Sequence, residues 1–267
     1  MEGSMMMEEL AGIVLAAGHG SLVPAQHQTK LIEEVRNRPM VCRPVQLLRD
    51  ELKLSPTLVV TNSRFGQQIR DAIKPHPQQW LIHQPERTGT AGAVLACLPS
   101  LRQLARTSKH AVVLYGDMPC WQTSSISGLL QQHVANQATI SMFRIDLRGA
   151  YGKHVQNFGR ILHDESGRIM AVREPYEMTA MELAQACYVN PSAWVFDLSW
   201  LEKHLLLLKP HDKSDGFAHE YWLPDLVPVA VEQNRLVIEV DLPDAREALG
   251  INTLEELQEV RTLTTEV

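Results

Sequence analysis

Small residues directly after an apolar run near the N-terminus could bring the backbone close to a phosphate. Ala16, Ala17, Gly18 and Gly20 follow the run that ends at Leu15. Small side chains at the carboxyl end of a strand let a ligand approach closely, and successive backbone N–H groups there can hold an anion. The segment matches neither the dinucleotide G-x-G-x-x-G spacing nor the P-loop motif. A glycine turn with a purely structural role is an equal alternative.

Two further segments offer a cation and an amide to such a ligand. Lys30 lies beyond a polar loop and could carry its charge to a phosphate, although a lone lysine is commonly just solvated. Gln84, Gly89 and Thr90 belong to a turn that leads from an apolar run into an apolar helical pattern. An amide beside exposed backbone N–H groups suits the edge of a pyrimidine base. The alternative is a helix cap made by the threonine.

A carboxylate stands at the end of another buried run. Asp117 follows Ala111–Tyr115 and precedes Pro119, at the kind of position where ligands of open α/β sheets bind. Mg²⁺ favours hard oxygen ligands, commonly one or two carboxylates together with substrate phosphates and water. We therefore expect Asp117 to bind Mg²⁺; a loop carboxylate that caps a turn is the alternative.

The elements that must position these residues follow a regular alternation in the first half of the chain. Strands alternating with helices of this length predict βαβ units and a mainly parallel sheet. The expected strands are Gly12–Ala16, Thr57–Thr61, Trp80–His83, Ala111–Leu114 and Thr139–Phe143. The expected helices are Pro39–Glu51, Phe65–Ile73, Thr90–Leu104 and Ser124–Ala135.

The second half has a different pattern, in which short β-like pieces alternate with polar loops. We expect strands at Arg160–Leu162, Arg168–Val172 and Trp194–Phe196, and helices at Ser199–Leu207 and Thr253–Leu263. Loops over the strand ends are where α/β folds place specificity. We predict one domain over residues 1–267, with a nucleotide-binding half (10–148), a smaller β-rich acceptor-binding insertion (149–252) and a C-terminal helix (253–267).

Composition excludes several classes of function. A net charge of -6 offers no broad basic surface for nucleic acid, and no apolar run is long enough to span a membrane. The N-terminal segment is acidic where a secretory signal would be basic. The four cysteines form no C-x-x-C pair and the eleven histidines no H-E-x-x-H motif. We expect a cytoplasmic protein that binds small molecules and has neither nucleic-acid nor membrane partners.

The order of these motifs resembles a known family. L-A-A-G-x-G, a lysine, Q-P-E-R-T-G-T, L-Y-G-D-M-P, F-G-R-I, V-N, E-Y-W-L-P-D and G-I-N-T-L-E-E-L occur in turn from Ala11 to Glu259. This series is similar to the uridyltransferase domain of the bacterial N-acetylglucosamine-1-phosphate uridyltransferases, which are sugar-phosphate nucleotidyltransferases. The resemblance implies a Rossmann-like three-layer α/β fold with a mixed, mainly parallel sheet.

The resemblance also implies roles for individual residues. Lys30 and Asp117 would be catalytic, and Asp117 and Asn252 would hold Mg²⁺. The nucleotide would contact Ala16, Ala17, Gly18, Gly20, Gln84, Gly89 and Thr90. The sugar would contact Tyr115, Gly159, Glu174, Asn190 and Asn252, with Arg173 competing for the place of Glu174.

The implied reaction is attack by the phosphate of N-acetylglucosamine 1-phosphate on the α-phosphorus of UTP. It yields UDP-N-acetylglucosamine, a cell-wall precursor, and pyrophosphate. The attacking phosphate is mostly dianionic at neutral pH, so catalysis requires positioning and charge stabilisation rather than a general base. The acetyl-CoA chemistry of bifunctional members is not expected, and the resemblance assigns no oligomeric state.

The sequence departs from the family pattern at two places. Leu22 stands where an arginine should bind the triphosphate, and His19, His27, Arg36 or Arg38 would have to replace its charge. The family's N-T-G reads Asn190-Pro-Ser here, and losing that glycine restricts the backbone and should reshape the sugar pocket. Two alternatives follow: a catalytically degenerate nucleotide-binding protein, and a nucleotidyltransferase with a different base or acceptor.

Overall fold

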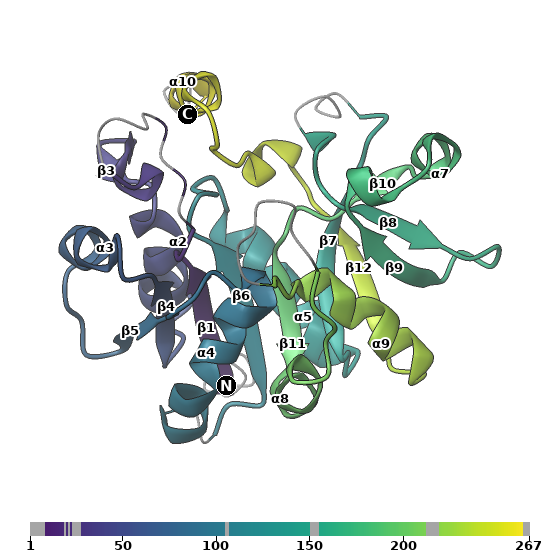
Figure 1. The fold of residues 1–267 in the computed structure, drawn as a ribbon, viewed down its shortest axis with the longest axis horizontal. Coiled ribbons are helices and arrows are strands. Elements are labelled where there is room, and N and C mark those ends of the chain that lie inside the picture. The colour runs from purple at the N-terminus through teal and green to yellow at the C-terminus, as the bar shows by residue number, and fades with distance from the viewer. Residues whose placement is uncertain are drawn as a thin grey trace.

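A computed structural model of the chain describes residues 9–18, 20, 22, 28–104, 107–149, 155–211 and 219–263. Its central feature is a ten-stranded sheet with helices on both faces (Figure 1). The strands are β1 (Leu10–Leu15), β4 (Thr57–Thr61), β5 (Gln79–His83), β6 (His110–Tyr115), β7 (Ile140–Asp146), β8 (Arg160–His163), β9 (Ile169–Arg173), β10 (Tyr188–Val189), β11 (Trp194–Asp197) and β12 (Val237–Asp241).

The strand order confirms the predicted mixed, mainly parallel α/β sheet. Strands β5, β4, β1 and β6 are parallel neighbours. Strand β11 pairs antiparallel between β6 and β7, and β12 adds to β7 in parallel. Strands β10, β8 and β9 extend antiparallel from the far end of β7 and form the smaller β-rich region. Strands from the second half of the chain therefore complete the sheet begun by the first.

Strands β1, β4 and β6 bury both faces, as their continuous apolar runs predict. Along β1, Leu10 and Val14 pack into one core cluster, whereas Ala11 and Ile13 pack into the other. Strand β6 alternates in the same way, because successive side chains point to opposite faces of a sheet.

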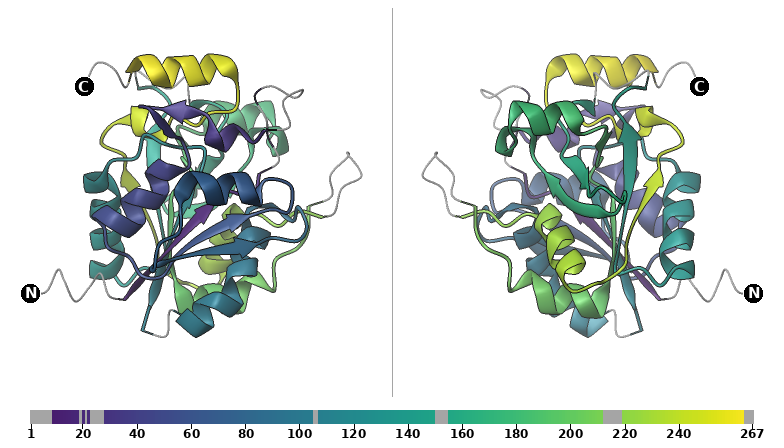
Figure 2. Two further views of the ribbon diagram at one scale, coloured as in Figure 1. Left: turned by 90° about the vertical axis from the view of Figure 1, so that its left-hand side faces the viewer. Right: turned by 90° about the vertical axis from the view of Figure 1, so that its right-hand side faces the viewer.

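Helices pack against the two faces of the sheet and complete both core clusters (Figures 1 and 2). The first cluster takes residues from α2 (Cys42–Gln46), α3 (Gly66–Ile73), α5 (Thr123–Ala135) and α10 (Leu254–Leu263). The second takes residues from α4 (Gly89–Leu104), α8 (Leu198–Leu205) and α9 (Leu226–Glu232). The short α7 (Ala180–Gln185) lies beside the β8–β9 pair. Single-turn helices are η2 (Lys30–Ile32), η4 (Pro175–Glu177), η5 (Leu223–Asp225) and η6 (Ala245–Ala248).

One expected helix begins later than the sequence indicates. Instead of a helix from Pro39 to Glu51, β2 (Glu34–Val35) and β3 (Arg38–Pro39) form a small hairpin. Arg36 and Asn37 both have positive φ, as a two-residue hairpin turn requires. The helix then starts at Cys42 and passes into the π-helical turn η3 (Leu47–Glu51).

Within the described residues, no helix is both long enough and apolar enough to cross a membrane.

Candidate functional site

A cleft opens where the parallel strands β1, β5 and β6 end. Eight of the residues singled out from the sequence line it: Ala17, Gly18, Lys30, Gln84, Gly89, Thr90, Tyr115 and Asp117. They come from the end of β6, the segments after β1, β5 and β6, the start of α4, and η2. The carboxyl ends of parallel strands meet at one edge of a sheet, which is where open α/β folds bind ligands.

Three residues far apart in the chain converge at one side of this cleft. Lys30 Nζ lies 2.7 Å from Asp117 Oδ2 and 2.6 Å from Asn252 Oδ1. Asn252 is brought there by the segment before α10, where Ile251 N donates to Asp117 O at 3.0 Å. One ammonium group thus lies against both oxygens that the family resemblance assigns to a metal.

The first loop is held open by an asparagine that the sequence did not single out. Asn62, which follows β4 and is buried, donates from Nδ2 to Ala17 O at 2.8 Å and to Gly18 O at 3.3 Å. A Cβ placed on Gly18 would have no heavy atom within 4 Å. Gly20 O accepts a hydrogen bond from Lys30 N at 3.1 Å, so the loop also fixes the lysine.

The turn after β5 is fixed by its own side chains and by the segment before η5. Gln84 is buried and donates from Nε2 to Thr88 Oγ1 at 2.9 Å and to Gly89 O at 3.3 Å. Gly89 has φ +78°, and a Cβ there would lie 2.5 Å from Tyr221 O. Only glycine therefore fits this position. Thr90 Oγ1 accepts from Leu223 N at 3.0 Å, which joins the turn to the second half of the chain.

Of the residues assigned to the sugar, Tyr115 lines the cleft and Asn252 contacts Lys30, whereas Glu174 does not line the cleft. Burial raises the pKa of the Tyr115 phenol, and the negative charges of Asp117 and Glu174 raise it further. Burial also raises the pKa of Glu174. Arg173 is exposed and contacts Glu182 instead, so the geometry favours Glu174 over Arg173 at this position.

Gly159 and Asn190 support this region rather than line the cleft. Asn190 N donates to Gly159 O at 2.9 Å, and Asn190 Nδ2 donates to Phe143 O at 3.3 Å. Ser192 N donates to Asn190 Oδ1 at 3.0 Å, and Ser192 has φ +60°. Ser192 thus adopts the left-handed conformation that glycine favours. The restriction of the backbone that the sequence predicts at this position is therefore not found.

Three of the cleft residues to which the sequence assigned no role carry polar side-chain groups. Arg87 Nε lies 3.2 Å from Glu220 Oε1, and Trp222 Nε1 donates to Glu220 Oε2 at 3.1 Å. All three line the cleft. The ring of His211 stacks on Trp222 with centroids 3.7 Å apart. Arg87 and Glu220 lie within two of the motifs that carry the resemblance, which is the signal that could have found them.

In the described part of the chain, the cleft does not contain the arginine that the family pattern assigns to the triphosphate. Leu22 packs against the first core cluster and carries no charge into the cleft. Arg36 and Arg38 line other hollows of the surface, and neither lines the cleft. His19 and His27 lie outside the described residues. Arg87 is therefore the arginine that the described cleft presents.

Comparison with known proteins agrees with this geometry. The model of the MobA-like NTP transferase domain family matches residues 12–186. The bifunctional protein GlmU of Geotalea daltonii is 26% identical over 253 residues, which is 95% of this chain and 52% of the relative. That of Carboxydothermus hydrogenoformans is 26% identical over 91% of this chain and 50% of its own length. That of Heliobacterium modesticaldum is 28% identical over 96% of this chain and 52% of its own length. The chain spans about half the length of these curated relatives.

Proposed function

The chain belongs to the MobA-like NTP transferase domain family, and from that premise we propose that it transfers a uridylyl group from UTP to a sugar 1-phosphate. The acceptor is proposed to be N-acetylglucosamine 1-phosphate, giving a UDP-sugar and pyrophosphate. The observation that carries the proposal is the contact of Lys30 Nζ with Asp117 Oδ2 and Asn252 Oδ1 at the cleft.

The donor set at this point fits Mg²⁺. Asp117 and Asn252 offer two hard oxygens close enough to share one cationic nitrogen, and Mg²⁺ commonly takes one or two such ligands plus substrate phosphates and water. Among the described residues, no group of three or more His, Cys, Asp or Glu side chains could hold a metal ion. Bound between Asp117 and Asn252, Mg²⁺ would neutralise charge that develops on the polyphosphate.

Lys30 would change partners during the reaction. Its side chain is only 12% exposed, so its present contacts with Asp117 and Asn252 replace water around the ammonium. When these oxygens bind a metal, Lys30 would turn to the phosphates of the nucleotide. There its charge favours the pentacoordinate arrangement at the α-phosphorus.

The orientation of Gln84 supports uracil as the base. Its Nε2 is fixed by donation to the carbonyl oxygen of Gly89, which can only accept. Oε1 is therefore left to accept a hydrogen bond, and uracil has an N3–H to donate where cytosine has none. Competition between UTP and CTP measures this preference, and we expect UTP to bind more tightly.

A substrate panel tests the proposed reaction. We expect magnesium-dependent pyrophosphate release with UTP and N-acetylglucosamine 1-phosphate, and a UDP-sugar detected by mass spectrometry. The panel includes the four common nucleoside triphosphates and several sugar phosphates. Absence of pyrophosphate release across the whole panel would contradict the proposal.

Leu22 motivates a second candidate function. With an apolar residue packed into the core where the family places an arginine, the chain would bind a nucleotide without turning it over. This candidate predicts that UTP raises the melting temperature while no pyrophosphate appears, and that Leu22→Arg restores turnover. If no nucleotide changes the melting temperature, this candidate fails.

A further inference from the structure

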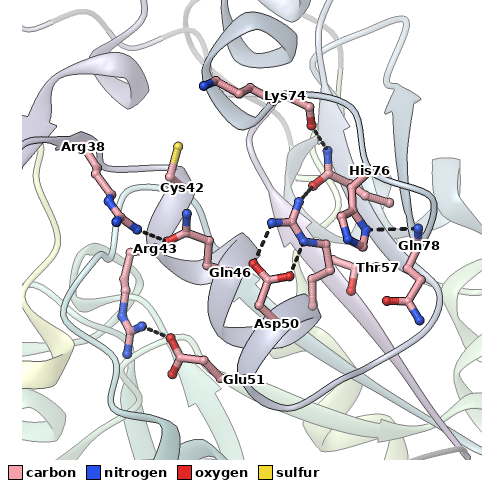
Figure 3. Close-up of polar contacts among 12 residues, drawn as sticks. Arg38, Cys42, Arg43, Gln46, Asp50, Glu51, Thr57, Lys74, His76 and Gln78 are labelled. Atoms are coloured by element: carbon pink, nitrogen blue, oxygen red, sulfur yellow. Dashed lines mark hydrogen bonds and ion pairs between the residues drawn. The ribbon is translucent and has the colours of Figure 1, made fainter.

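A second hollow lies between α2 and the end of α3, and its polar lining is basic. Figure 3 shows the side chains around it, with the Cys42 thiol between Arg38 and the ammonium end of Lys74 in this view. The lining includes Arg38, Cys42, Gln46, Arg49, Lys74 and His76. None of these residues lines the nucleotide cleft. We call this hollow the basic groove.

The positive charge of the basic groove is only partly compensated. Arg49 binds Asp50 through Nε and Nη2, at 2.7 and 2.6 Å, and its Nη1 donates to Gln79. The carboxylate of Asp50 is therefore already paired. In the part of the chain that the structure describes, neither Arg38 nor Lys74 has a carboxylate partner. Two cations thus face the groove although the whole chain has a net charge of -6.

Neutral groups in the groove also present donors. His76 Nδ1 accepts a hydrogen bond from Gln78 N at 3.2 Å, so in the neutral ring the proton lies on Nε2, which can donate. Gln46 Oε1 accepts from Arg38 Nη1 at 3.1 Å, which orients the guanidinium. Burial raises the pKa of the Cys42 thiol, while Arg38, Arg49 and Lys74 lower it. The charges of Arg38, Arg49 and Lys74 therefore all act on the Cys42 thiol.

Lys74 holds a backbone conformation that favours glycine. It ends α3 with φ +57° and ψ 153°, where a side chain is strained. A glycine at this position would relieve the strain but remove the ammonium from the groove. Strain of this kind often accompanies a binding role.

The elements that form the walls of the groove also contact the two neighbours of Lys30 in the chain. Thr29 N donates to Gln68 Oε1 on α3 at 3.1 Å, and Val41 N, directly before α2, donates to Leu31 O at 3.1 Å. Both contacts flank Lys30 in the single turn η2. A ligand that bridges the two walls therefore acts on the elements that position Lys30.

We propose that the basic groove is a regulatory site for a small phosphate-bearing anion. Arg38 and Lys74 bind the anion, and His76 donates to it. Binding requires nothing of the catalytic cleft, whereas its effect on turnover rests on the proposed nucleotidyltransferase function.

Inorganic phosphate is the probe, and thermal unfolding without nucleotide is the first measurement. We expect phosphate to raise the melting temperature above that in sodium chloride of equal ionic strength, which separates binding from screening. Arg38→Gln with Lys74→Gln should weaken phosphate binding at least tenfold. The matched control, Lys203→Gln with Arg235→Gln, removes two exposed charges elsewhere and should leave binding unchanged. Equal phosphate affinity in the two double variants overturns the proposal.

Two further measurements distinguish phosphate binding in the basic groove from a purely structural effect of the substitutions. Lys74→Gly should raise the melting temperature without phosphate and still lose the response to phosphate. In a Cys120→Ser, Cys187→Ser background, phosphate should slow alkylation of Cys42 at least threefold. Unchanged alkylation, or a full phosphate response in Lys74→Gly, contradicts the assignment. These measurements use no substrate, so they stand or fall separately from the test of the reaction.

Discussion

At the scale of single residues, the described cleft presents Arg87 and not the arginine that the family pattern places at Leu22. Leu22 is partly buried and packs against the first core cluster. Arg87 reaches the cleft from the turn after β5, where it pairs with Glu220. Sequence spacing could not show that Arg87 lines the cleft, because Arg87 is distant in the chain from Leu22, where the family pattern has its arginine. The motif order did predict that Lys30, Asp117 and Asn252 come together.

Arg87→Gln tests whether this arginine serves the triphosphate. Hydrogen bonds to charged groups contribute about 1.5–3 kcal/mol, so we expect kcat/KM for UTP to fall on the order of ten- to a hundredfold. Arg102→Gln is the control, because Arg102 pairs with Glu202 away from the cleft. Equal kinetics in both variants would show that Arg87 has no part in nucleotide binding.

A buried histidine gives the protein a defined acid sensitivity. His133 is fully buried against Ser141 and His110, and burial, together with His110, lowers its pKa to about 4 from 6.5. The folded state therefore favours the neutral ring. The stability that the neutral His133 ring contributes is complete above the pKa of this histidine in the unfolded state. It is lost as the pH falls from about 6.5 to 4, by roughly 3 kcal/mol in total.

His133→Asn retains a polar group for Ser141 and removes the titration. We expect it to be less stable than the wild type at pH 8, because it leaves space in the core. Its free energy of urea unfolding should nevertheless fall less steeply between pH 6.5 and 5. An identical slope in the two proteins would mean that other groups cause the acid sensitivity.

At the scale of elements, the turn after β5 and the segment before η5 form one unit. Ala91 N donates to Tyr221 O, and Tyr221 N donates to Thr88 O, both at 2.9 Å. The sequence shows both segments as motifs but not their contact, since more than a hundred residues separate them. Gly89 allows this close approach.

Gly89→Ala should break that unit. Its Cβ would lie 2.5 Å from Tyr221 O at a positive φ, so we expect a loss of about 1–3 kcal/mol in the free energy of unfolding. Gly128→Ala on α5 is the control, because no heavy atom lies within 4 Å of its added Cβ, and alanine there should stabilise the helix by up to about 1 kcal/mol. Similar effects of both changes on stability would contradict the packing described.

Elements of the second half were harder to predict for identifiable reasons. Helix α9 contains Pro228, which reads as a helix breaker although proline is tolerated in a first turn. Strand β10 has only two residues, too few for a periodic pattern. Strand β12 is defined by its pairing with β7, a contact that local sequence does not contain. The long apolar strands β1, β4 and β6 were predicted to within a few residues.

At the scale of the whole molecule, one sheet brings both halves of the chain to the same cleft. Strands β1 and β6 end at the cleft, and β11 pairs antiparallel beside β6. The segment before α10 then returns to Asp117 and delivers Asn252. We propose that this convergence of residues binds a metal-bridged polyphosphate.

Calorimetric titration of UTP, with and without Mg²⁺, tests that claim most directly, in the wild type and in Asp117→Asn. We predict that Mg²⁺ tightens UTP binding to the wild type at least tenfold and that Asp117→Asn loses most of this gain while keeping its fold. Equal UTP affinity in the two proteins, or no effect of Mg²⁺ on the wild type, would contradict the account.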